Sequence, residues 1–309
     1  MRRVVLLGPQ RFEPSLLATL DSLGCGEPLA VVTAGWQERE DETEELGHHV
    51  GRELINLRLY RRAEEVVSED EALAGALRQR QEELQHLQDL YRSRLAPGLE
   101  AARDLLQRPG KARFVESHRR AAIRAVRTLD RQHLVHVRRV DAEFEARWNL
   151  PERASVRRHR DQIAEALDAC AAVVVSGGHV AVLINRLRMF GIASLQWSVP
   201  VIAWSAGAMA VSERIVLFHD SPPQGPGDAE VLEWGLGLCS GVILLPHASR
   251  RLRLDDPLRV ALLSRRFSPA LCVPLDAGSR IDWHENRWIP QAGMRALGRR
   301  GALRKMVKS

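Results

Sequence analysis

Hydrophobic positions along this chain follow two different spacing patterns, and the pattern changes near residue 68. Before that point, short apolar runs are separated by amphipathic or mixed stretches; the apolar runs are residues 3–7, 29–33 and 54–60. Apolar, β-branched runs bounded by Gly and Pro predict buried strands, and the amphipathic stretches between them predict helices. This succession of strand, helix and strand indicates a parallel sheet with helices on its faces.

From residue 68 the apolar positions recur at steps of three and four residues. One stripe runs from Leu73 to Leu106 with an interruption at Pro97, and a second runs from Val115 to Trp148. Such stripes predict two long amphipathic helices, and the turn-forming residues between them predict an antiparallel helical hairpin. We expect the hairpin to be inserted within the α/β domain, as a lid over the active-site edge or as a dimer contact.

Short apolar runs typical of buried strands appear again after residue 150. Buried apolar runs and a small terminal hairpin follow; they are residues 171–176, 199–204, 241–245, 270–275 and 281–289. The predicted fold class is therefore α/β, with a mostly parallel sheet flanked by helices. We expect a discontinuous domain formed by residues 1–67 and 151–294, an inserted hairpin at 68–150 and a basic tail at 295–309.

Composition narrows the class of protein. The chain has 309 residues and lacks a run of 18 apolar residues, so we expect no transmembrane span. Its start leads directly into a strand, without the apolar length or cleavage site of a signal peptide. The four cysteines are far apart and lie in apolar surroundings, which predicts reduced core thiols and a cytoplasmic protein.

The net charge of +6 is unevenly distributed. Residues 38–45 are strongly acidic, residues 111–160 are rich in arginine, and residues 295–308 contain basic groups and no acid. A basic surface can attract nucleic acid, but arginine-rich helix faces are commonly solvated or paired within the same protein. Because no recognised nucleic-acid motif accompanies the charge, we do not expect nucleic acid as a partner.

The clearest candidate for chemistry is Ser205, at the end of the apolar run 199–204. Small residues surround it: Ala203 two places before, Ala206 directly after and Gly207 two places after. A strand followed by a serine and a helix is typical of a nucleophile elbow, in which a strained turn presents the serine oxygen. The first residues of the following helix have free N–H groups, so Ala206 is a candidate oxyanion donor.

Two further strand ends carry groups that suit the same chemistry. Gly177 and Gly178 follow the run 171–176, and their backbone can approach a ligand closely or simply form a tight turn. His247 follows the run 241–245 and is the candidate general base. His133, by contrast, lies on the apolar face of the second long helix, where we expect a core histidine and not a metal ligand.

Four segments in this order resemble one family: Ser-Gly-Gly-His at 176–179, Trp-Ser-Ala-Gly-Ala at 204–208, Leu-Pro-His at 245–247 and Leu-Asp-Ala-Gly-Ser at 275–279. They resemble the serine peptidase family of cyanophycinase and aspartyl dipeptidase (dipeptidase E). The resemblance implies a fold like that of class I glutamine amidotransferases. It covers residues 160–290 well and 1–60 loosely, and it does not extend to the helical insert.

The resemblance implies that Ser205 is the nucleophile, that His247 is its base, and that the N–H groups of Gly178 and Ala206 bind the oxyanion. His179 stands where the family usually has Asn, a change that bears on substrate placement. The family's triad acid is typically a Glu, and the matching position here is Ala277. Two other acids are candidates for that role, Asp276 and Asp220.

The sequence therefore predicts a serine peptidase or amidohydrolase that acts on small peptides or amides through an acyl-enzyme. The family cleaves next to aspartyl residues, and Arg250 is a candidate for binding an acidic substrate. We expect no cofactor and no metal. The alternative is a non-catalytic binding or assembly protein that keeps the fold, with the helical insert mediating homo-oligomerisation or partner contact.

Overall fold

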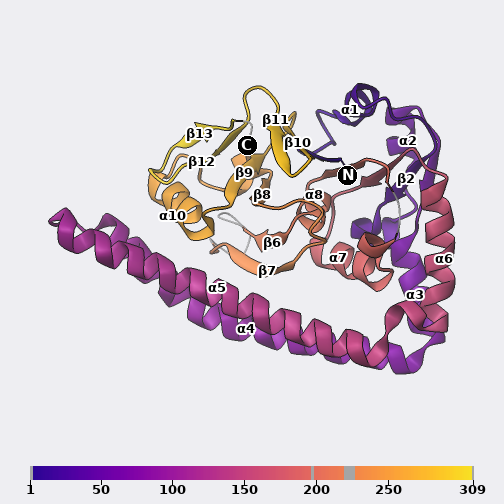
Figure 1. Ribbon diagram of the computed structural model, residues 1–309, viewed down its shortest axis with the longest axis horizontal. Helices are drawn as coiled ribbons and strands as arrows, with labels where there is room; N and C mark the ends of the chain where they lie inside the picture. Colours follow the sequence, from indigo (N-terminus) through magenta and orange to yellow (C-terminus); the bar gives the residue numbers. More distant parts are fainter. Residues whose placement is uncertain (1–2, 196–197, 219–226, 308–309) are drawn as a thin grey trace.

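The computed structural model describes residues 3–195, 198–218 and 227–307. Its central element is a seven-stranded sheet (Figure 1) with the order β11-β10-β1-β5-β4-β2-β3. The five strands from β1 to β3 in that order are parallel, and β10 and β11 extend the sheet as an antiparallel edge. The strands are β1 (Val4–Leu7), β2 (Leu29–Val32), β3 (Leu54–Asn56), β4 (Ala172–Val175), β5 (Val201–Trp204), β10 (Arg280–His284) and β11 (Arg287–Pro290).

Both faces of the sheet are covered, which explains why its strands are apolar throughout. In β1, Val4 and Leu6 join one hydrophobic core while Val5 and Leu7 join another. The first core is closed by α3 (Leu59–Glu69), α6 (Ala154–Asp168), α7 (Val180–Met189) and α8 (Ala206–Val211). The second is closed by α1 (Leu16–Ser22) and α2 (Glu44–Val50). The predicted α/β fold with a mostly parallel sheet is confirmed.

Further strand pairs lie beside the sheet. β6 (Arg214–Leu217) pairs antiparallel with β7 (Glu230–Trp234), and β8 (Val242–Pro246) pairs in parallel with β9 (Leu271–Leu275). Two helices follow β8, namely α9 (Ala248–Arg251) and α10 (Pro257–Phe267). The segment expected as a basic tail contains a short hairpin of β12 (Arg295–Leu297) and β13 (Leu303–Lys305).

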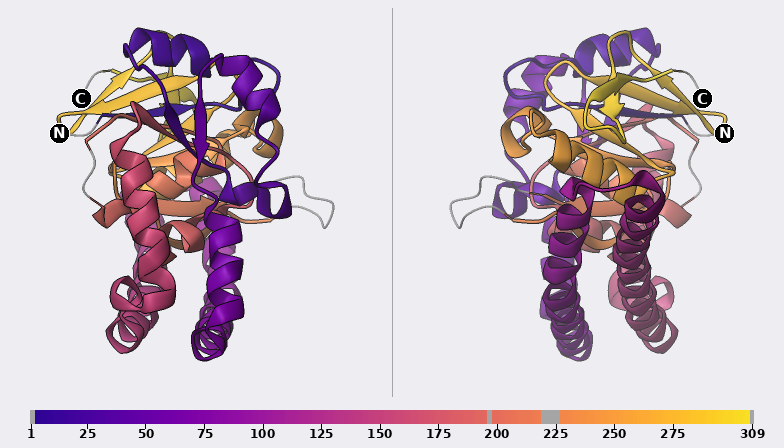
Figure 2. Two further views of the ribbon diagram at one scale, coloured as in Figure 1. Left: turned by 90° about the vertical axis from the view of Figure 1, so that its right-hand side faces the viewer. Right: turned by 90° about the vertical axis from the view of Figure 1, so that its left-hand side faces the viewer.

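The helical insert consists of α4 (Glu71–Gln107) and α5 (Ala112–Trp148). The two helices lie side by side along one edge of the body and project beyond it (Figures 1 and 2). The expected interruption at Pro97 is wrong, because α4 continues through this exposed proline. The predicted start at residue 68 is also early, since α3 includes Ser68 and the chain breaks at Asp70 instead.

One ion pair closes the base of the insert. Asp70 accepts a hydrogen bond from the Leu73 N–H at 3.0 Å and so caps the start of α4. The same carboxylate binds the guanidinium of Arg153, which precedes α6, with one contact at 2.7 Å. This hydrogen-bonded arginine lowers the pKa of Asp70 to about 2. The entry and exit of the insert are therefore held together.

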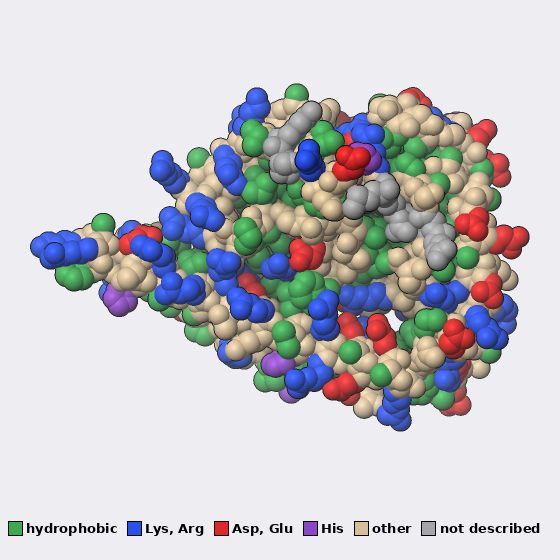
Figure 3. Space-filling view, in the orientation of Figure 1, with side chains coloured by type: hydrophobic (Ala, Val, Ile, Leu, Met, Phe, Trp, Pro, Cys, Tyr) green, Lys and Arg blue, Asp and Glu red, His purple; other side chains and the backbone are tan. Residues whose placement is uncertain are grey.

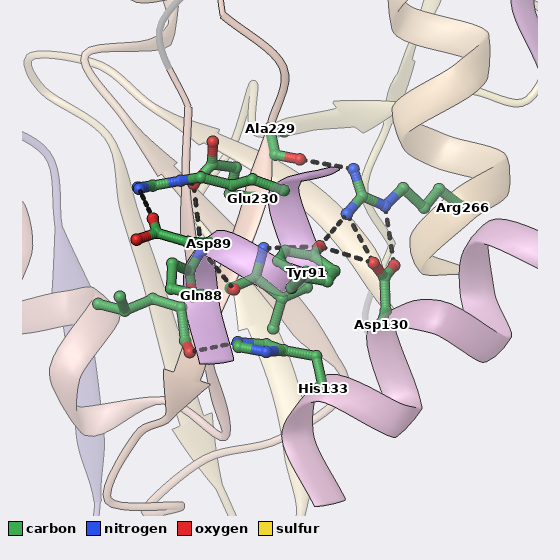
Figure 4. A network of polar contacts seen from close by, with 11 residues as sticks. Gln88, Asp89, Tyr91, Asp130, His133, Ala229, Glu230 and Arg266 are labelled. Atoms are coloured by element: carbon green, nitrogen blue, oxygen red, sulfur yellow. Dashed lines mark hydrogen bonds and ion pairs between the residues drawn. The ribbon is translucent and has the colours of Figure 1, made fainter. Parts of the chain in front are cut away.

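A buried polar network joins the insert to the body (Figure 4). Asp130 of α5 receives hydrogen bonds from Tyr91 of α4 at 2.8 Å and from Arg266 of α10 at 2.7 and 2.8 Å. Arg266 also donates to the Ala229 carbonyl at 2.6 Å. His133 stacks on Tyr91 with ring centroids 4.3 Å apart and is 4% exposed, as expected of a core histidine. The network fixes α5 against α10 and the start of β7.

The four cysteines are free and buried, as predicted. Burial raises the pKa of the Cys272 thiol to about 12, which disfavours the reactive thiolate. Among the described helices, none has the length and apolar character needed to span a bilayer.

Candidate active site

Ser205 occupies the sharp turn that its sequence context predicts. β5 ends at Trp204, Ser205 has φ 51° and ψ −121°, and α8 begins at Ala206. A positive φ is strained for a serine and must be held by its surroundings. The turn also requires Gly207, since a Cβ there would lie 2.3 Å from the carbonyl oxygen of Val175. The predicted elbow geometry is present.

His247 lies beside this serine. It follows β8 with φ 57° and ψ 34°, and its Nε2 is 3.5 Å from Ser205 Oγ. Both side chains are half-buried. This distance is at the long end for a hydrogen bond, as is common for catalytic pairs without substrate. The imidazole Nε2 and the serine hydroxyl therefore face each other within reach of a hydrogen bond.

The surroundings of His247 favour the neutral imidazole. Burial lowers its pKa, and the positive charges of Arg251 and Arg250 lower it further, while the charge of Asp276 acts in the opposite direction. A neutral imidazole at neutral pH has the free electron pair that a general base needs.

Asp276 reaches the neighbourhood of His247 through strand register. β8 and β9 are parallel with Pro246 opposite Leu275, so His247 and Asp276 leave the pair at the same end. The Asp276 Oδ1 accepts hydrogen bonds from the Ser249 backbone N–H at 3.0 Å and from its hydroxyl at 2.9 Å. Within the described residues, no hydrogen bond joins Asp276 to the imidazole. Asp220, the other candidate acid, lies outside the described residues.

The loop after β4 forms the other wall of the site. A Cβ at Gly177 would lie 3.0 Å from the Cβ of Ser205, so this glycine is directly beside the serine. Gly178 has φ 115°, and a Cβ there would lie 2.2 Å from the Gly35 carbonyl oxygen. Neither the Gly178 N–H nor the Ala206 N–H donates to another described residue. Two backbone donors are thus available near the serine.

His179 and Arg250 border this site in different ways. The His179 N–H donates to the Gly35 carbonyl at 2.7 Å, and its Nδ1 accepts from the Val182 N–H at 3.3 Å. The side chain therefore caps α7, and its Nε2 is left for other contacts. Arg250 is exposed on α9 and makes no ion pair or hydrogen bond through its side chain with the described residues.

Sequence reasoning missed two supporting residues. Ser249 fixes the carboxylate of Asp276, yet a serine two places after a histidine carries no recognisable signal. Gly35 supplies the carbonyl that positions the loop at 177–179, and the sequence carries no signal for this contact. Within the described part of the chain, no group of three or more His, Cys, Asp or Glu side chains could hold a metal ion.

Comparisons with known proteins give one family match and one similar solved structure. The sequence profile of peptidase family S51 matches residues 129–284, about half of the chain, including the elbow and His247. A solved structure titled as a peptidase from an acI-B1 Actinobacterium is similar, with a TM-score of 0.46 and 13% identity, covering 97% of this chain and 91% of that one. No curated protein sequence matches significantly. The chain therefore belongs to peptidase family S51 and is a serine peptidase.

Proposed function

We propose that the peptidase reaction proceeds through an acyl-enzyme formed on Ser205. The serine oxygen attacks the carbonyl carbon of the scissile amide while His247 Nε2 accepts the serine proton. The imidazolium then gives this proton to the leaving amine as the carbon–nitrogen bond breaks. Water, deprotonated by the same imidazole, hydrolyses the ester and releases the acid. The observation that carries the proposal is the strained Ser205 turn with His247 Nε2 at 3.5 Å.

The oxyanion of each tetrahedral intermediate would be bound by the N–H groups of Gly178 and Ala206. The Ala206 N–H directly follows Ser205, and Gly178 follows Gly177, which lies beside the serine; neither N–H is used among the described residues. Ala206 also begins α8, so its N–H is one of the donors that a helix leaves free at its start. Such preorganised donors typically contribute about 10²–10³-fold to kcat.

The substrates we propose are small peptides or amides with an acidic group near the scissile bond. The Arg250 guanidinium forms no ion pair with the described residues and lies close enough to His247 to lower its pKa, which supports a carboxylate-binding role at the edge of the site. His179 Nε2 would contact the substrate as well. The aspartyl preference itself rests on the resemblance to cyanophycinase and aspartyl dipeptidase.

For the acid of the triad, we propose that Asp276 acts on His247 through charge and not as the hydrogen-bonded orienting group. Its Oδ1 is already engaged by Ser249, while its charge favours the imidazolium. The orienting role is then proposed for Asp220, on sequence grounds alone.

Covalent labelling with a fluorophosphonate probe tests the proposal. We expect the wild type to be labelled at Ser205, the Ser205→Ala variant to remain unlabelled, and His247→Asn to react at least about 10²-fold more slowly. Ser93→Ala is the matched control, because Ser93 is an exposed serine on α4. Mass spectrometry of the labelled peptide identifies the modified residue.

Two outcomes would contradict this assignment. A folded wild type that is never labelled, with a circular dichroism spectrum of mixed helix and strand, would favour the non-catalytic binding or assembly protein. Labelling that persists in Ser205→Ala would move the nucleophile to a different residue.

A further inference from the structure

Arginines recur along one side of α5, where Glu116 stands between the first two and pairs with Arg120 at 3.5 Å. They stand at positions 113, 120, 124, 127, 131 and 138, at intervals of 7, 4, 3, 4 and 7 residues. With 3.6 residues per turn, these intervals return to the same side of a helix each time. The row is about 37 Å long, given a rise of 1.5 Å per residue. All six side chains are exposed except Arg127, which is half-buried.

The central part of the row is not neutralised by the rest of the described chain. Arg124, Arg127 and Arg131 form no ion pair or hydrogen bond with the described residues. Residues 117–140 contain seven arginines and a single acid, Asp130, which is buried and bound to Arg266. Like charges at three- and four-residue spacing destabilise a helix. Such a row destabilises the helix slightly, and a negative partner would relieve the repulsion between its charges.

The row belongs to a larger basic end of the molecule. Lys and Arg side chains predominate over the projecting hairpin and the neighbouring part of the body in Figure 3, where acidic groups are few. Near this end lie α10 and the β12–β13 hairpin (Figure 1), with exposed basic side chains at Arg295, Arg304 and Lys305. Acidic groups concentrate at the opposite end of the molecule in Figure 3. The molecule is therefore strongly polarised along the hairpin.

A lipid bilayer fits this surface poorly. A helix that lies on a bilayer needs an apolar face beside its basic one. Among the described residues of α5, the only large hydrophobic side chains that are strongly exposed are Phe114 and Val135, at 58% and 53%. They are 21 positions apart along the helix and form no stripe.

The acidic surface of a second copy also fits poorly. The chain's own acidic run at residues 38–45 is short and in part used within the chain: Asp41 pairs with Arg61 at 2.8 Å, Glu42 pairs with Arg39, and Glu40 is buried. A repeating, unneutralised polyanion matches a long straight row better, and the phosphate backbone of a nucleic acid provides one.

We propose that this face of α5 binds the phosphate backbone of double-stranded nucleic acid without sequence preference. The arginines would form charge-assisted hydrogen bonds with successive phosphates and release their counterions. This property does not depend on the peptidase site. It also revises the expectation from the sequence, which assumed that the arginine-rich face would be solvated or paired internally.

Fluorescence anisotropy of a labelled 20-base-pair duplex of random sequence, titrated with the full-length protein, tests the proposal. With about four phosphates contacted, log K should fall against log salt with a slope of about −3 to −4. Binding should therefore weaken about 10²-fold between 50 and 200 mM NaCl. The variant with Arg120, Arg124, Arg127 and Arg131 all changed to Gln should lose most of the affinity and most of this slope.

The matched control carries the same loss of charge elsewhere, with Arg61, Arg78, Arg157 and Arg287 changed to Gln. All four are exposed and lie outside α5. We expect this control to keep most of its affinity, and both variants to keep wild-type fluorophosphonate labelling, which reports an intact body. If both variants lost the same affinity for the duplex, binding would depend on net charge alone, which would overturn the proposal. So would an absence of duplex binding, or preferential binding of poly-glutamate or of phosphatidylserine vesicles.

Discussion

Asp276 is held by Ser249 through two hydrogen bonds to one carboxylate oxygen, at 3.0 Å from the backbone N–H and 2.9 Å from the hydroxyl. Both donors come from α9, which begins directly after His247. Asp276 is therefore fixed close to His247, and among the described residues no hydrogen bond joins it to the imidazole ring. This arrangement differs from a triad in which the acid itself sets the orientation of the histidine.

The first prediction concerns this acid. Asp276→Asn should lower kcat/KM by about 10-fold, far less than the roughly 10⁴-fold expected when the orienting acid of a triad is lost. It should also move the acid limb of the pH profile to lower pH, because the carboxylate favours the imidazolium. Steady-state kinetics of Asp276→Asn and Asp220→Asn, compared side by side, measure both effects. A loss near 10⁴-fold in Asp276→Asn alone would give Asp276 the orienting role instead.

The second prediction concerns Arg250. Its positive charge disfavours the imidazolium of His247, so Arg250→Gln should raise the pKa of this histidine. Reactivity that needs the neutral imidazole should then appear at higher pH than in the wild type. The rate of fluorophosphonate labelling against pH reports this directly, without an acidic substrate. Arg287→Gln, an exposed change on β11, should leave the pH profile unchanged. A shift of equal size in this control would exclude a specific effect of the Arg250 charge on His247.

The third prediction tests the oxyanion loop. Gly178→Ala places a Cβ 2.2 Å from the Gly35 carbonyl oxygen and must displace the loop. We expect kcat to fall about 10²–10³-fold. Gly24→Ala is the matched control, since Gly24 also has a positive φ but no atom within 4 Å of an added Cβ. Thermal unfolding of both variants separates strain from catalysis, and an unchanged kcat in Gly178→Ala would exclude the donor role.

The fourth prediction concerns the base of the insert. Asp70→Asn keeps a capping oxygen but loses the charge that binds Arg153. The pKa of Asp70 is about 2 in the folded protein, below its ordinary value of 3.8. The charge therefore stabilises the fold above about pH 4, and this stabilisation is lost as the pH falls towards 2. Urea unfolding should show a deficit of up to about 2 kcal/mol at pH 7 that disappears near pH 2. Asp104→Asn, in an exposed pair with Arg108, should cost under about 0.5 kcal/mol.

The fifth prediction concerns the buried network. Asp130→Ala leaves Arg266, which is 2% exposed, without its counter-charge, so the free energy of unfolding should fall by about 3–5 kcal/mol. Tyr91→Phe keeps the ion pair and should cost about 1–3 kcal/mol, because it removes one buried hydroxyl. Urea unfolding measures both. Equal losses in the two variants would mean that the tyrosine hydroxyl, and not the ion pair, stabilises this contact.

Most of the fold was predicted correctly from local patterns of apolar and polar residues. The parallel strands of the central sheet are apolar because both faces are buried, and Ser205 follows one of them; His247 follows β8, a buried apolar strand that pairs with β9 beside that sheet. β7 was not predicted, since Glu230 and Glu233 interrupt its apolar pattern. Those carboxylates are satisfied by Arg92 and Arg188, which come from distant helices. Sequence spacing does not reveal such partners.

The same limit applies to the contacts that support the site and the insert. Asp130 and Arg266 are 136 positions apart, so nothing local indicates that they meet. Asp276 and Ser249 are brought together by the register of β8 and β9, and a strand pair of that kind cannot be read from periodicity. At Pro97 the local signal predicted a helix interruption that is absent from α4. Burial of Leu95 and Leu99 on either side outweighs the local cost of the proline.

The junction at Asp70 and Arg153 has an evolutionary consequence. The chain leaves and re-enters the peptidase body at adjoining points. The contacts of the body at this junction are therefore the same whether the segment between them is long or short. Whole helical turns can be gained or lost at the distal turn near residue 110 without altering the spacing between Ser205 and His247. The reach of this insert can therefore change while the body that holds Ser205 and His247 stays as it is.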